Sequence, residues 1–121
     1  MQLSDNELAL ITWTSLSEPG DALANLLWST IGPGVLQQAK TGDFKPWYKA
    51  VGKSHPEYLS QLRPAIERIS LRLPSVNPHQ LVERGIRWNC KPVSLENLPE
   101  TRRRLADLGL HAPLMLWVAG N

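Results

Sequence analysis

The C-terminal segment constrains the fold of this chain more than any other part of its sequence. Residues 114–118 read Leu-Met-Leu-Trp-Val and are apolar at every position, without the alternation of a strand that has one solvent face. This pattern predicts a strand buried on both faces of a sheet. Only one other strand is predicted upstream, and two strands do not make an independently stable sheet. We therefore expect the chain to be the front part of a larger protein, or to pair its sheet with another chain.

Length and composition exclude several classes of protein. A chain of 121 residues can form one domain with a modest core, or a small domain with an appendage. No apolar run approaches the roughly 20 residues that span a bilayer, so no membrane partner is expected. Residues 1–8 carry acids but no Lys or Arg, unlike a signal peptide. Cys90 is the only cysteine and is expected to be an inert, buried thiol in a cytoplasmic protein.

Charge is distributed unevenly along the chain. The net charge is +2, yet residues 1–39 contain four acids and no Lys or Arg. Residues 40–104 contain all 13 basic residues and six acids, a local charge of +7. A polyanionic partner such as a nucleic acid should therefore meet the middle and late part of the chain and not its beginning.

Helix signals dominate the first 75 residues. Ser4 and Glu7 form a capping-box pattern that opens a first helix. Asp21 is placed to cap a second helix over residues 22–30. Pro64 is expected to kink or split the last helix of this part. Three further helices are expected, over residues 33–40, 47–51 and 57–73.

The pattern changes after residue 76. A short helix is expected to end at Gly85, and the alternation of residues 86–90 predicts a strand. Pro99 should start another helix, which precedes the strand of residues 114–118. The predicted fold class is mainly α: a helical domain, SAM-like or helix-hairpin-helix-like, over residues 1–75, and a small α/β extension with two strands over residues 76–121.

Catalytic motifs are missing from the sequence. The histidines His55, His79 and His111 lie far apart, and no spacing typical of a metal site occurs. The sequence also lacks a P-loop, a nucleophile elbow and a dinucleotide-binding glycine motif. We therefore expect no enzymatic activity and no cofactor.

The turn Gly32-Pro33-Gly34 between two predicted helices is one candidate site. In a helix-hairpin-helix, glycines at Gly32 and Gly34 would let backbone N–H groups approach a DNA phosphate. The nearest basic residue is Lys40, and the segment before the turn is acidic. A tight helix–helix turn without a ligand is the favoured interpretation.

Two basic clusters are further candidates for nucleic-acid contacts. The first interleaves lysines with Trp47 and Tyr48, which would stack on unpaired bases or, in the favoured alternative, pack between helices. In the second, Arg102-Arg103-Arg104, successive side chains point about 100° apart on a helix, so one should pair with Glu100 or Asp107. The lysines of the first cluster are Lys40, Lys45, Lys49 and Lys53.

Two groups of residues carry a family resemblance. Residues 16–23 read Leu-Ser-Glu-Pro-Gly-Asp-Ala-Leu and are followed by Ile31-Gly32-Pro33. The more specific group includes Gly85-Ile86-Arg87-Trp88, Asp107-Leu108-Gly109 and the Ala-Pro-Leu-Met-Leu-Trp-Val-Ala-Gly-Asn of residues 112–121. In this order, these segments resemble the N-terminal region of the DNA-processing protein family DprA, also called Smf, and its actinobacterial members in particular.

The resemblance implies a function and a fold. Proteins of this family bind single-stranded DNA during natural transformation and help to load the RecA recombinase. This chain would be an accessory part, with two strands that belong to an extended Rossmann sheet. The Rossmann-like domain that contacts DNA and RecA, and dimerises, has no counterpart in these residues. Two alternatives remain: a stand-alone DNA-binding module of the helix-hairpin-helix type, and a protein-interaction module. Association into a homo-oligomer is also left open.

Overall fold

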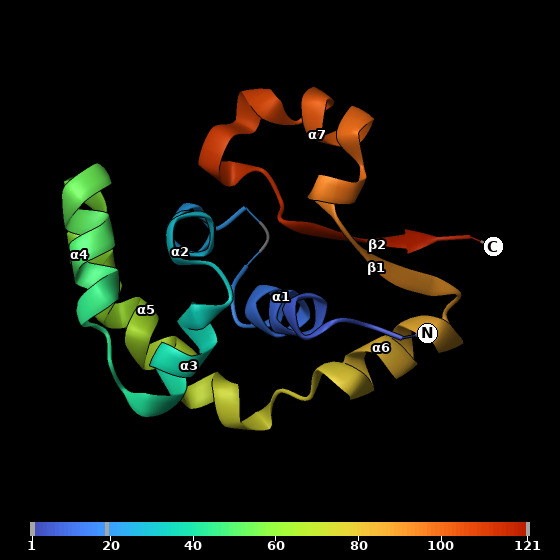
Figure 1. Cartoon of the computed structure of the whole chain (residues 1–121), viewed down its shortest axis with the longest axis horizontal. Helices are drawn as coiled ribbons and strands as arrows, with labels where there is room; N and C mark the ends of the chain where they lie inside the picture. The colour runs from blue at the N-terminus through green and yellow to red at the C-terminus, as the bar shows by residue number, and fades with distance from the viewer. Residues whose placement is uncertain (1, 19, 121) are drawn as a thin grey trace.

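The computed structural model describes residues 2–18 and 20–120 and is mainly helical, with one small sheet. Figure 1 shows α4 and α5 at one end of the molecule and the sheet, with both chain termini, at the other. No helix of the described residues has the length and apolar composition to cross a membrane. The principal elements are α1 (Asp5–Ser15), α2 (Ala22–Ile31), α3 (Gly34–Thr41), α4 (Lys45–Ser54), α5 (Leu59–Arg72), α6 (Pro78–Arg87), β1 (Cys90–Ser94), α7 (Pro99–Arg104), the 3-10 segment η4 (Ala106–His111) and β2 (Met115–Ala119).

The helix starts that were predicted from capping residues are confirmed. The Ser4 hydroxyl accepts from the Glu7 N–H, and the Glu7 carboxylate accepts from the Ser4 N–H, both at 3.1 Å. Asp21 caps α2 by accepting from the N–H of Ala24 at 3.1 Å. Gly42 ends α3 in the left-handed conformation that glycine adopts without strain. These ends are set by neighbouring residues, which is why local sequence reasoning finds them.

Two fully buried tryptophans organise the helical core. Trp13 of α1 and Trp47 of α4 pack edge to face, with ring centroids 5.7 Å apart. The indole N–H of Trp13 donates to the carbonyl of Ala24 at 3.0 Å, and that of Trp47 donates to the Gln38 side chain at 2.8 Å. Both rings are thus buried without an unsatisfied N–H group. Their neighbours in the core come from α2, α3, α4 and α5 and include Leu27, Val35, Val51 and Leu62.

Two helices are longer or more continuous than predicted. α4 spans Lys45–Ser54 instead of residues 47–51, because Trp47 and Val51 anchor one face and tertiary packing extends it. α5 continues through Pro64, so of the two expected effects of this proline, a kink or a split, the split does not occur. Pro64 is exposed, and the carbonyl that loses its helical partner there can be hydrated.

The strand predicted over residues 86–90 is also wrong. α6 continues to Arg87, Asn89 turns the chain with a φ of 56°, and β1 begins at Cys90. Gly85 does not end the helix; it lies inside α6, where a Cβ atom would be 2.5 Å from the Trp117 ring. Glycine is therefore required here by close packing of α6 against β2, a contact that the local pattern does not reveal.

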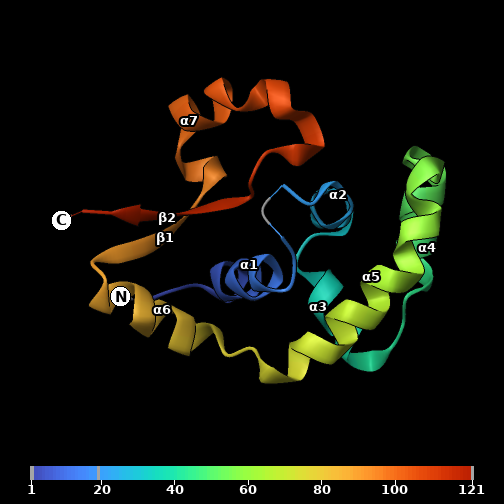
Figure 2. The same ribbon diagram turned by 180° about the vertical axis from the view of Figure 1, so that it is seen from behind.

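The sheet consists of two antiparallel strands in the described part of the chain. Cys90 is opposite Ala119, and Pro92 is opposite Trp117. Seen from either side, the sheet lies between α1 and α6 below and α7 above (Figures 1 and 2). The expectation that residues 114–118 are buried on both faces is not met, since Trp117 is 41% exposed. With only one neighbouring strand, β2 has too few partners to be covered on all sides.

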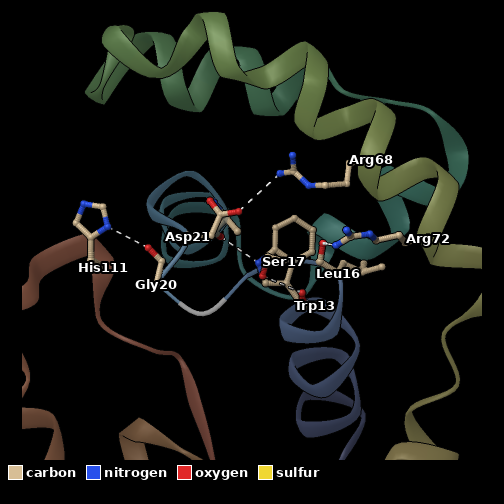
Figure 3. Close-up of polar contacts among 9 residues, drawn as sticks. Trp13, Leu16, Ser17, Gly20, Asp21, Arg68, Arg72 and His111 are labelled. Atoms are coloured by element: carbon tan, nitrogen blue, oxygen red, sulfur yellow. Dashed lines mark hydrogen bonds and ion pairs between the residues drawn. The ribbon is translucent and has the colours of Figure 1, made fainter.

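The C-terminal part is hydrogen-bonded to α2 and to Gly20, which lies just before this helix. The amide of Asn25, a residue only 7% exposed, donates to the carbonyls of Leu110 and Ala112, each at 2.7 Å. Nδ1 of His111 lies 3.0 Å from the Gly20 carbonyl oxygen (Figure 3).

Helix α5 contacts Leu16 and Asp21, which flank the connection between α1 and α2, from the other side. Arg68 lies 3.7 Å from the carboxylate of Asp21, and Arg72 donates to the Leu16 carbonyl at 3.5 Å. Figure 3 shows that the two arginines and His111 approach these residues and Gly20 from opposite directions. Residues far apart in the sequence thereby hold Leu16, Gly20 and Asp21 in place.

Candidate nucleic-acid interface

The lysine row, defined as Lys45, Lys49 and Lys53, follows one face of α4. Spacings of four residues place the three side chains along one side of the helix, opposite the buried Trp47 and Val51. All three are exposed, and none forms an ion pair with an acid of the described residues. The helix thus exposes a row of positive charges that no acid of the described residues neutralises. Such a row attracts the negatively charged phosphate backbone of a nucleic acid.

The two aromatic residues of this stretch have different environments. Trp47 is fully buried, so the interpretation that it packs between helices is confirmed and it cannot stack on a base. Tyr48 is 44% exposed, so the packing interpretation is wrong for this residue, and it lies three residues after Lys45, which makes the two side chains neighbours on the surface of α4. A partly exposed phenol ring beside a lysine provides the stacking surface that single-stranded nucleic acids use. Tyr48 therefore extends the lysine row.

Lys40 lies near this surface in the sequence but on another helix. It occupies the last turn of α3 and is exposed. Gly42 then reverses the chain, and α4 begins at Lys45. The structure thus places Lys40 and the lysine row on consecutive helices that meet at this turn.

The turn between α2 and α3 has the expected tight geometry. Gly32 has a φ of 84°, in the region that favours glycine. The N–H of Val35 donates to the Gly32 carbonyl at 3.1 Å, and the N–H of Leu36 donates to the Pro33 carbonyl at 3.2 Å. These two groups at the start of α3 are already satisfied within the turn, so they are poorly placed to bind a phosphate. The geometry favours the plain helix–helix turn over the DNA-binding version at Gly32 and Gly34.

A cleft of about 680 Å³ separates the α2–α3 turn from the C-terminal segment. Gly32 and Arg102 both line it, so the structure brings together two candidate residues that are remote in sequence. Glu7 and Glu96 line it as well, so its acids outnumber Arg102 among charged side chains. A polyanion would meet repulsion there, which makes the cleft a weaker nucleic-acid site than α4.

The three arginines of α7 behave as their helical spacing predicts. Arg103 donates to Glu100 at 3.0 Å, which confirms the expected ion pair. Arg102 and Arg104 are exposed. Both ribbon views show α7 above the sheet and α4 at the far end of the molecule, so α7 and the lysine row do not form one surface (Figures 1 and 2).

Among the described residues, no group of three or more His, Cys, Asp or Glu side chains is placed to hold a metal ion. Sequence reasoning did not find the cleft, because its walls come from α1, α2 and residues 94–114 and no local pattern joins them.

Comparison of the chain with protein-family models, curated proteins and solved structures found no match.

Proposed function

We propose that this chain is an accessory, DNA-contacting module of a DNA-processing protein similar to the DprA family. In this proposal it touches single-stranded DNA through the lysine row and Tyr48. Loading of RecA during recombination would depend on other parts of such a protein. The proposal is supported by the resemblance of residues 16–33 and 84–121 to that family.

The observation that carries the DNA contact is the exposed face of α4. Three lysines without ion pairs follow one side of the helix, and a partly exposed tyrosine lies beside them. Lysines bind the backbone of any sequence, and an aromatic ring stacks on any base. We therefore expect binding without sequence preference, weaker for duplex DNA, in which the bases are already stacked. A helix-hairpin-helix contact through Gly32 is the less favoured mode, because its amides are bonded internally.

The test is oligonucleotide binding as a function of salt concentration. For single strands, the logarithm of the binding constant falls with the logarithm of salt by about 0.7 per phosphate contact. Replacing Lys45, Lys49 and Lys53 together by alanine should weaken binding to a single-stranded oligonucleotide at low salt. It should also reduce the magnitude of the slope by about 2. Tyr48→Ala should weaken binding without changing the slope.

A control variant separates this site from general electrostatics. Replacing Arg84, Arg87 and Lys91 by alanine removes the same charge from exposed positions near the sheet. This control should bind more tightly than the α4 variant and keep a steeper salt slope. Equal affinities and slopes for the two triple variants would show that α4 is not the binding surface.

A further inference from the structure

The register of the sheet determines which backbone groups of each strand point outward. Hydrogen bonds join Leu95 to Leu114 and Gly120 to Asn89 at the two ends of the ladder, at 3.0 and 3.1 Å. In an antiparallel pair, hydrogen-bonded positions alternate with positions whose N–H and C=O groups point away from the partner. The outward positions are therefore Met115, Trp117 and Ala119 in β2, and Cys90, Pro92 and Ser94 in β1.

The two outer edges of the sheet are not equivalent. On β1, the central outward position is Pro92, which has no N–H, so this edge cannot accept a regular additional strand. The β2 edge, defined as the outward backbone groups of Met115, Trp117 and Ala119, has all its donors. No hydrogen bond from the described residues reaches these groups. The strand also lacks the lysine, proline or bulge by which exposed edges are usually protected.

We propose that two copies of this chain associate through the β2 edge, antiparallel about a two-fold axis at Trp117. The pairing places Trp117 opposite its own counterpart and Met115 opposite the partner's Ala119. All three outward residues then exchange hydrogen bonds, so the strand is complementary to itself. The product is a four-stranded sheet with a Pro92-containing β1 strand at each end.

The side chains of β2 suit a second copy. The strand has no charged residue, so self-pairing brings no like charges together. The Trp117 side chain is 41% exposed, and aromatic residues paired directly across strands stabilise a sheet. This inference does not depend on DNA binding, because the sheet and α4 lie at opposite ends of the molecule (Figure 2).

Sedimentation equilibrium of the full chain tests the association. Edge pairing buries little surface, so we expect a monomer–dimer equilibrium with a dissociation constant on the order of 10 µM. Ala119→Pro removes an outward N–H at an exposed residue and should weaken the dimer at least tenfold with the helical circular dichroism retained. A chain that stays monomeric at concentrations far above this range would overturn the proposal. An unchanged dimer in a folded Ala119→Pro variant would overturn it as well.

A charge exchange at Trp117 tests the two-fold axis. Trp117→Lys and Trp117→Glu should each be monomeric alone, because equal charges would face each other. An equimolar mixture should form the dimer again, since only pairing about Trp117 places Lys opposite Glu. Leu108→Lys, at an exposed apolar residue outside the sheet, adds the same charge and should leave the dimer intact. If the mixture of two folded variants fails to associate, the proposed axis is wrong.

Discussion

Gly85 of α6 and Trp117 of β2 are packed so closely that no larger residue fits at position 85. A Cβ atom there would lie 2.5 Å from the tryptophan ring and 3.1 Å from the Cys90 carbonyl oxygen. The backbone of α6 therefore rests directly on the sheet, and the position of the helix depends on the absence of one side chain.

Substitution of Gly85 by alanine should destabilise the protein by about 1–3 kcal/mol, because overpacking outweighs the gain in helix propensity. Gly52, inside α4, is a matched control: a Cβ atom there meets only Leu59, at 3.8 Å. Gly52→Ala should stabilise by about 0.5–1 kcal/mol. Urea unfolding measures both changes, and equal signs for the two variants would contradict the packing argument. A Trp117→Leu background should reduce the cost of Gly85→Ala.

Loss of the Asn25 side-chain amide should loosen the C-terminal segment. Asn25→Leu keeps the volume but leaves the carbonyls of Leu110 and Ala112 without their donor, at a cost of about 1–3 kcal/mol in unfolding free energy. Asn6→Leu, at an exposed residue of α1, should change stability by less than about 0.5 kcal/mol. Thermal unfolding provides the comparison, and similar midpoints for the two variants would show that the bonds to Leu110 and Ala112 contribute little.

Asp21 combines a helix cap with an ion pair, and two substitutions separate the contributions. Asp21→Asn keeps the cap of α2 but loses the partner of Arg68, so it should cost less than about 1 kcal/mol. Asp21→Ala should cost about 1 kcal/mol more, because the N–H of Ala24 loses its acceptor. Chemical denaturation at low and high salt is the measurement. Asp21→Asn and Arg68→Gln both lose the ion pair, and this loss of unfolding free energy should become smaller at high salt. The additional loss in Asp21→Ala comes from the helix cap and should not change with salt.

The arginines of α7 should contribute little to binding of single-stranded DNA. Arg103 is paired with Glu100, and α7 lies apart from α4. Replacing Arg102 and Arg103 by alanine should therefore weaken oligonucleotide binding far less than replacing Lys45 and Lys49, which removes the same charge. Fluorescence anisotropy with a labelled oligonucleotide compares the two double variants. A larger loss for the α7 variant would place the interface at the cleft instead.

Local sequence signals predicted the ends of the helices, whereas the features that the sequence did not predict depend on long-range contacts. The caps at Ser4 and Asp21 depend on residues three positions apart, so the sequence alone identified them. The sequence predicts a helix end at Gly85, because no neighbouring residue indicates that the Trp117 ring packs against this position and leaves no room for a side chain. For the candidate site, four-residue spacing could place the lysine row on one face, but the separate environments of Trp47 and Tyr48 depend on how α4 packs.

The tryptophans of this chain occupy contrasting environments, and that contrast gives the molecule built-in optical reporters. Trp13 and Trp47 are sealed in the helical core, whereas Trp88 is 81% exposed beside the sheet. A soluble quencher such as acrylamide should reach the Trp88 indole in the native protein and the core pair only after the helices open. Emission recorded with and without quencher would thus report separately on the two ends of the molecule.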